Sequence, residues 1–156
     1  MTRTPGGALS RRLRVRDDRG AATIFVVGLS VMLLVVAGLV VDGGLAINAR
    51  STAFDIAEQA ARAGAKEVDI ETLRSTGRVQ VDRGAGETAA NDFLDKALAD
   101  KRSPTREVTV DGNEVNVRVG YEVRTALLGL VGRQSFTVGA RATARAAVGI
   151  ENEIGP

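Results

Sequence analysis

Carboxylates are the side chains of this sequence most able to do chemistry, because paired Asp or Glu residues act as general acids, bases and metal ligands. Asp92, Asp95 and Asp100 follow one another closely. They are interspersed with Lys96 and Lys101, as on a helical face exposed to water. This pattern favours a solvated surface over an active site, so we expect no catalytic residues in this segment.

The other chemical motifs are weak. The segment 84–86 (GAG) lacks the strand, the turn and the GK[ST] sequence of a phosphate-binding loop. Asp82 and Asp111 lack the spaced oxygen ligands of a calcium loop. The chain has no histidine and no cysteine, which removes the commonest general base and the thiolate ligands. We therefore expect a protein that is not an enzyme, with no metal site and no cofactor. A membrane-tethered hydrolase would require Asp82, Asp111 and Glu114 to meet in a cleft.

Charge and aromatic content argue against a nucleic-acid partner. The net charge is +2, but residues 1–20 hold six arginines and two aspartates, and the rest has 15 basic and 17 acidic residues. The excess of positive charge therefore belongs to the amino-terminal tail alone. With four Phe, one Tyr and no Trp, the chain offers few rings on which bases or sugars could stack.

The elements that position these groups begin with an uncharged run, Ala21–Val41, of 21 residues. A helix needs about 20 apolar residues to cross a bilayer, so this run predicts a transmembrane helix and a membrane-lipid partner. The arginine-rich residues 1–20 place the amino terminus in the cytoplasm and the remainder outside. Asp42 is the first charge after the span and marks the membrane exit.

A removable signal peptide is the alternative interpretation of this run. Secretory signals have an apolar core of about 7–15 residues, followed by a small-residue cleavage site. The core here is longer, and the segment 42–45 (DGGL) offers no such site. A retained anchor is the prediction.

After the span, residues 42–73 keep a helical rhythm. The residues expected on one packed face are Ile47, Phe54, Ala57, Ala61, Gly64 and Val68, at steps that fit one side of a helix. This part of the helix is rich in small residues (Ala57, Ala60, Ala61, Ala63, Gly64 and Ala65), and small residues let backbones approach closely. This face could cover the sheet of the same domain, or it could also pack between subunits; the two are compatible.

The carboxy-terminal half predicts one more helix and a small sheet. Residues 74–86 are expected to form a loop or crossover and residues 87–101 a short helix that stops at Ser103-Pro104. Alternating valines then predict three antiparallel strands, the first two joined by a turn at 111–113. The expected fold class is α+β: a long transmembrane and amphipathic helix, a short second helix and a three-stranded meander. The expected parts are the tail 1–20, the span 21–41, an exported domain 42–148 and a loose tail 149–156.

The segment 19–22 (RGAA) and the apolar helix after it carry a family resemblance. A basic tail, a glycine and an immediate apolar helix resemble the signal of type IV pilins. The further features 41–44 (VDGG) and Asp55 to Ala61, a D-x-A-x-x-A-A pattern, are similar to tight-adherence (Flp-type) pilus assembly proteins of the TadE and TadG kind. The resemblance covers about residues 17–66, and the later strands fit more loosely.

This resemblance implies a pilin-like fold and a structural role in a Flp pilus or related secretion apparatus. It implies cleavage between Gly20 and Ala21 by a prepilin peptidase, with other pilin-like subunits and an assembly platform as partners. Pilins carry a glutamate near the start of the mature helix, where this chain has Phe25. The departure favours a minor, pseudopilin-like component over a major filament subunit. The alternative is an unprocessed, anchored module that presents its sheet to an envelope partner.

Overall fold

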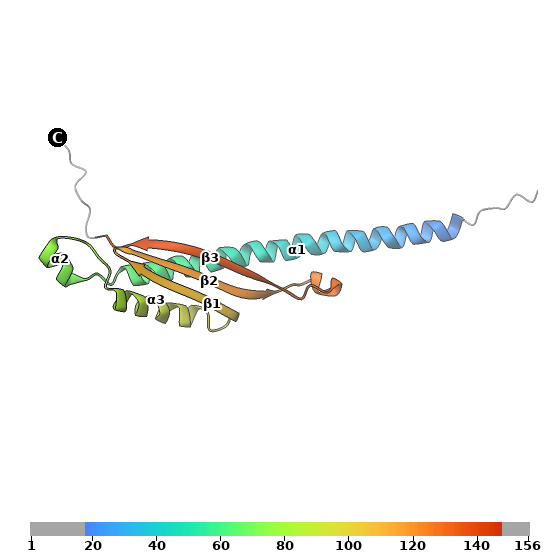
Figure 1. The fold of residues 1–156 in the computed structure, drawn as a ribbon. Helices are drawn as coiled ribbons and strands as arrows, with labels where there is room; N and C mark the ends of the chain where they lie inside the picture. The colour runs from blue at the N-terminus through green and yellow to red at the C-terminus, as the bar shows by residue number, and fades with distance from the viewer. Residues whose placement is uncertain (1–17, 148–156) are drawn as a thin grey trace, which may run out of the picture. The chain divides into compact units, whose positions relative to one another are not determined.

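The computed structural model describes residues 18–147, and it begins with one long helix. Helix α1 runs from Asp18 to Ala65, and the chain divides into two compact units within it, at Val36 and Ala37 (Figure 1). Among the described residues, α1 is the one helix long and apolar enough to cross a membrane. Most of the predicted tail 1–20 and all of the tail 149–156 lie outside the described residues.

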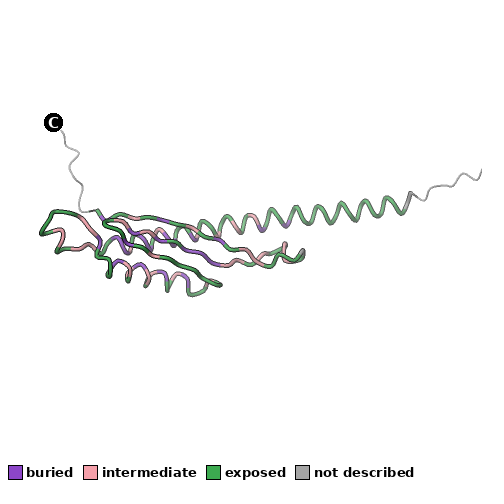
Figure 2. Tube along the Cα trace, in the orientation of Figure 1, coloured by how far each residue is buried: buried purple, intermediate pink, exposed green. Residues whose placement is uncertain are grey.

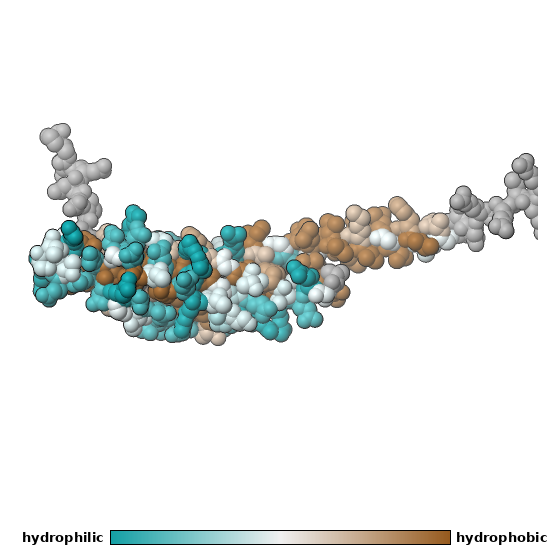
Figure 3. Space-filling model, viewed as in Figure 1, coloured by the Kyte–Doolittle hydropathy of each residue, from teal (hydrophilic) through white to brown (hydrophobic). Residues whose placement is uncertain are grey.

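The described part of the first unit is an apolar helix whose side chains are not covered by the rest of the protein. Its large side chains are exposed, with Phe25 at 71% and Leu34 at 70%, and the tube in Figure 2 is green along this stretch. Figure 3 shows the same stretch as an apolar surface. Such exposure is unfavourable in water and ordinary in lipid, which fits the predicted span.

The second unit, from Ala37 onward, is an α+β domain. Two further helices and three strands follow α1: α2 Ile70–Thr76, α3 Arg83–Ala97, β1 Arg102–Asp111, β2 Glu114–Arg124 and β3 Ser135–Arg145, with a 3₁₀ turn, η1, at Leu128–Val131 before the last strand. The sheet is antiparallel in the order β1-β2-β3. The predicted fold class is therefore confirmed.

The core lies between one face of the sheet and the helices α1 and α3. Val115, Val117 and Val119 of β2 are almost completely buried against alanines of α1 and Leu94 of α3, and Figure 2 shows these facing stretches in purple. The opposite face of the sheet is polar and carries the ion pair Arg118–Glu107 at 2.8 Å. One buried and one solvated face produce the period-two pattern of the sequence.

The connection between α1 and α3 differs from the prediction. Helix α1 ends at Ala65 and does not continue to residue 73, because the chain turns back so that Val68 bridges to Val81. Asp69 then caps α2 by accepting the Thr72 amide at 3.0 Å. The stretch expected to be a loop includes the start of α3, whose first turn is capped by Asp82. Side-chain caps satisfy amides at helix starts and fix these boundaries.

Strand β1 also begins earlier than predicted. Ser103 and Pro104 belong to it, although the proline was expected to act only as the end of the preceding helix. The pairing with β2 is irregular between Arg102 and Thr105. Proline is tolerated at such a place because β1 is an edge strand and the ladder is already interrupted.

Candidate functional site

The face of α1 that packs on the sheet is the first part of the candidate site. Ala57 and Ala61 are fully buried, Gly64 is buried and Val68 is half-buried. Ile47 and Phe54, by contrast, are 74% and 47% exposed, so the sheet does not cover these two positions of the predicted face, and packing between subunits stays a prediction. The stripe that does face the domain consists of Gly38, Asp42, Ala46, Ala49, Ala53, Ile56, Ala57, Ala60, Ala61, Gly64 and Ala65. It follows the same helical period, shifted around the helix.

Two glycines let α1 and α3 touch. A Cβ on Gly64 would lie 2.8 Å from the carbonyl oxygen of Gly86, and a Cβ on Gly86 would lie 2.7 Å from Cγ1 of Val81. Both distances are shorter than van der Waals contact allows. The segment 84–86, which the sequence excluded as a phosphate loop, therefore holds a glycine needed for helix packing.

Asp42 is the centre of the site. Its side chain is 2% exposed, and it is the one buried polar or charged residue among those the structure describes. Its carboxylate accepts three backbone amides from the loop between β2 and β3: Ala126 at 2.6 Å, Leu128 at 2.6 Å and Leu127 at 3.1 Å. Charge-assisted hydrogen bonds of this kind are stronger than neutral ones. Asp42 therefore clamps the loop to α1.

Burial and hydrogen bonding act on Asp42 in opposite directions. Desolvation raises the pKa of the carboxyl group, but the amides of Leu128, Ala126 and Leu127 together lower it. The net pKa lies below its ordinary value of 3.8, because donors that favour the charged form outweigh the cost of burial. Asp42 is ionised at neutral pH and acts as a hydrogen-bond acceptor for the loop.

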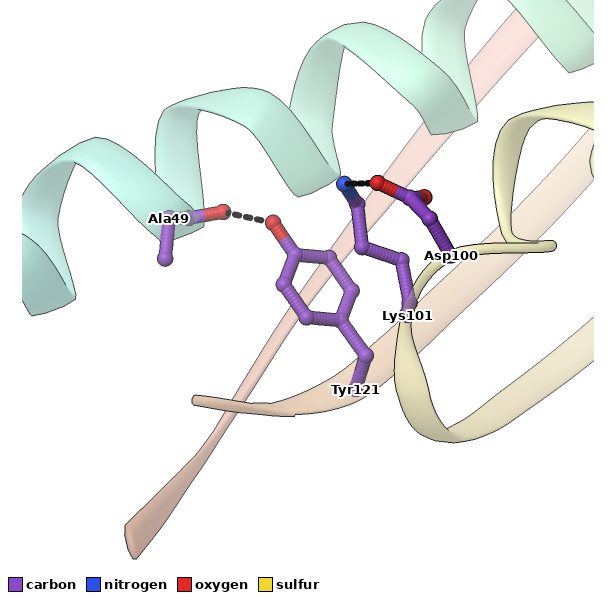
Figure 4. A network of polar contacts seen from close by, with 4 residues as sticks. All are labelled: Ala49, Asp100, Lys101 and Tyr121. Carbon is purple, nitrogen blue, oxygen red and sulfur yellow. Dashed lines mark hydrogen bonds and ion pairs between the residues drawn. The ribbon is translucent and has the colours of Figure 1, made fainter. Parts of the chain in front are cut away.

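A second polar link joins α1 to the sheet. The hydroxyl group of Tyr121 on β2 donates a hydrogen bond of 2.7 Å to the carbonyl oxygen of Ala49 (Figure 4). Lys101 lies 5.7 Å from the centre of the tyrosine ring and pairs with Asp100 at 3.0 Å. Tyr121 is 5% exposed, so the link holds the middle of α1 against the sheet away from water.

Several of the carboxylates that could have formed an active site have structural roles. Asp82 caps α3, Glu114 pairs with Arg145 across the sheet, and Asp95 pairs with Arg106. Within residues 18–147, no group of three or more acidic residues is arranged to hold a metal ion.

The sequence did not reveal the clamp at Asp42. A charge next to a span is expected in any membrane protein, so its position alone carried no signal. The available signal was its spacing: Asp42 lies four residues before Ala46 and four after Gly38, in line with the buried stripe. The apolar segment 127–131 (LLGLV) was the second feature that could have indicated the contact between Asp42 and this loop.

This arrangement defines a class: a long apolar helix that continues, through a buried acidic residue, into a small α+β domain. Comparison with known families shows which of them part of this chain resembles. A family model described as putative Flp pilus-assembly TadE/G-like matches residues 20–67. The resemblance predicted from the sequence is confirmed for this segment, which includes nearly all of α1. No curated protein and no solved structure matches the chain.

Proposed function

We propose that the protein is a non-enzymatic assembly component of a Flp-type pilus or related secretion apparatus, of the minor pilin or pseudopilin kind. The match of residues 20–67 to the TadE/G-like model is the observation that carries this proposal. The exposed apolar surface of α1 before Val36 supports it, because pilin-like subunits need a helix that lipid or other helices can cover. The arginines of residues 1–20 favour a cytoplasmic amino terminus and an exported domain.

Processing at Gly20 gives the first test. A Gly20→Ala substitution leaves the helix unperturbed, because a Cβ at this position meets no atom within 4 Å. We expect the wild-type protein purified from membranes to begin at Ala21 by intact mass. The Gly20→Ala variant is expected to keep residues 1–20, with less than a tenth of the wild-type pilus number in a deletion strain.

Gly28 supplies the matched control. A Cβ at Gly28 also meets nothing within 4 Å, and Gly28 lies in the same apolar helix but away from the junction. Gly28→Ala should therefore be processed and should restore pili. Full rescue by Gly20→Ala with an unchanged protein mass would instead favour the unprocessed, anchored binding module. The polar outer face of the sheet, with its Arg118–Glu107 pair, is the surface such a module would present.

Ile47 and Phe54 are proposed contacts to neighbouring pilin-like subunits. Both are large, apolar and exposed on the part of α1 that belongs to the α+β domain. Exchanging both for serine should leave the unfolding temperature within about 2 °C of wild type, because exposed positions contribute little to stability. The same exchange should reduce pilus number several-fold in the complemented strain.

The exposed pair Arg74 and Thr76 on α2 is a control site at which double serine substitution is expected to have no effect. Normal piliation by the Ile47 and Phe54 variant would refute this contact.

A further inference from the structure

An apolar loop lies beside the point where the apolar helix ends. The connection between β2 and β3 contains the run Leu127, Leu128, Gly129, Leu130 and Val131, part of which forms η1. Leu130 is 87% exposed, more than any other large apolar residue among those described, and Leu127 is 38% exposed. A run of this kind on a water-exposed loop is unusual, because connecting segments are generally polar.

The loop is packed on the last turn of the predicted span. A Cβ placed on Gly38 would lie 3.2 Å from Cβ of Leu127 and 3.9 Å from Cδ2 of Leu128. Gly38 comes one helical turn before Asp42, and both belong to the same compact unit as the loop. The loop that carries Leu130 therefore packs on α1 beside the end of the predicted span.

The backbone of the loop suits a poorly hydrated site. Asp42 accepts the amides of Ala126, Leu127 and Leu128. Within the loop, further hydrogen bonds join Thr125 to Gln134, Leu130 to Leu127, Gly132 to Gly129 and Arg133 to Leu128. Polar backbone groups must be satisfied internally where water is scarce. The carboxylate of Asp42 is itself covered by these donors, so no bare charge stands beside the leucines.

Two cations flank the apolar run. Arg124 and Arg133 are exposed, and neither forms an ion pair within the described residues. Arginine guanidinium groups bind phosphate oxygens well, and their aliphatic stems can lie along apolar surface. A run of leucines between two arginines in the sequence matches the two layers of a bilayer surface, in which the lipid phosphates lie outside the acyl chains.

We propose that the β2–β3 loop is a second membrane contact, with Leu130 inserted among the lipid acyl chains and Arg124 and Arg133 at the phosphates. This inference rests on the membrane anchoring in the proposed function. Lipid is the favoured occupant because the loop is continuous with Gly38 and the end of the apolar span. The contact would make the α+β domain sit on the bilayer, held by α1 and by the loop.

A nitroxide side chain at position 130 tests the proposal. The chain has no cysteine, so Leu130→Cys in the full-length protein gives a single labelling site. The labelled protein is reconstituted in vesicles of phosphatidylcholine and phosphatidylglycerol, and collision rates with oxygen and with a water-soluble nickel chelate are measured. Asn113→Cys is the control, because Asn113 is exposed in the turn at the other end of β2.

Position 130 is expected to show more collisions with oxygen and fewer with nickel than position 113, since oxygen concentrates in the acyl region. Equal nickel access at the two positions would overturn the proposal while leaving the anchoring intact. Low collision rates with both reagents at position 130 would mean that protein covers the loop, which also overturns the lipid contact. If the protein does not float with the vesicles, it is not anchored in the membrane, and both the anchoring and the loop contact are refuted.

Discussion

Exchanging Gly86 for alanine is expected to remove about 2–3 kcal/mol from the free energy of unfolding of the α+β domain, because overpacking a tight helix contact forces backbone shifts. The new Cβ would lie 2.7 Å from Cγ1 of Val81 and 3.1 Å from the carbonyl oxygen of Gly64. Val81 is 6% exposed and cannot swing away into water. A loss of this size is a large part of the roughly 5–15 kcal/mol that stabilises a typical domain.

Tyr121 provides the measurement, since it is the one tyrosine in a chain without tryptophan and is buried at the interface of α1 and β2. Its fluorescence during urea titration in detergent reports the packing of the domain. Gly84→Ala is the matched control in the same helix, because its Cβ would meet only a carboxylate oxygen of Asp82 at an ordinary 3.6 Å. Gly84 is exposed, so alanine there should change the free energy of unfolding by less than about 0.5 kcal/mol. Equal stability of the two variants would show that the helices do not meet at Gly86.

The sheet could be predicted because its strands and its first turn depend on residues that are close together in the sequence. Alternation of valines from Val115 to Val123 reports one buried and one solvated face, and Gly112, with φ at 59°, provides the positive φ that a tight turn requires. Each strand is paired with its neighbour in sequence, so the order β1-β2-β3 followed directly. The long apolar helix was predictable for the same reason, since residues 21–41 are all uncharged and most of them are apolar.

The packed face of α1 was not predictable to the residue. Alanines occupy adjacent positions around the helix, for example Ala60 and Ala61, so a search for apolar spacing has several equivalent solutions. Ala57, Ala61 and Gly64 of the predicted face are buried, but the larger residues Ile47 and Phe54 lie at positions that the sheet does not cover. Close approach to the valines of β2 requires small side chains, which is why the covered face is the alanine-rich one.

The contact of Asp42 was hidden for a different reason. Its partners, Ala126 to Leu128, lie 84 to 86 residues away, and they contribute backbone amides, which every sequence contains. No residue type marks an amide as a ligand. Only the three-dimensional path of the β2–β3 loop brings the donors to the carboxylate, so the sequence could predict a charge at the membrane exit and nothing about its function there.

Exchanging Asp42 for asparagine should release the β2–β3 loop. The neutral amide has one acceptor oxygen instead of two and turns an NH₂ donor towards backbone N–H groups, so buried amides lose their partner. We expect the amides of Leu127 and Leu128 to exchange with deuterium about tenfold faster or more, the ratio that corresponds to losing one charge-assisted hydrogen bond. The amides at the centre of β2, such as that of Val117, serve as the internal control, and they should change less.

The same variant should also change how stability depends on pH. The pKa of Asp42 is lowered below 3.8 in the folded chain, so the folded state binds this proton less tightly than the unfolded state does. The stability that Asp42 contributes is therefore complete above about pH 5 and is lost as the pH falls through 3.8 towards the lower pKa of the folded state. Asp69 and Asp100 have lowered pKa values as well, and they remain in both proteins. The unfolding temperature of the wild type should consequently exceed that of Asp42→Asn at pH 7, and the difference should shrink towards pH 3. A difference that stays constant from pH 7 to pH 3 would show that the ionised carboxylate does not hold the loop.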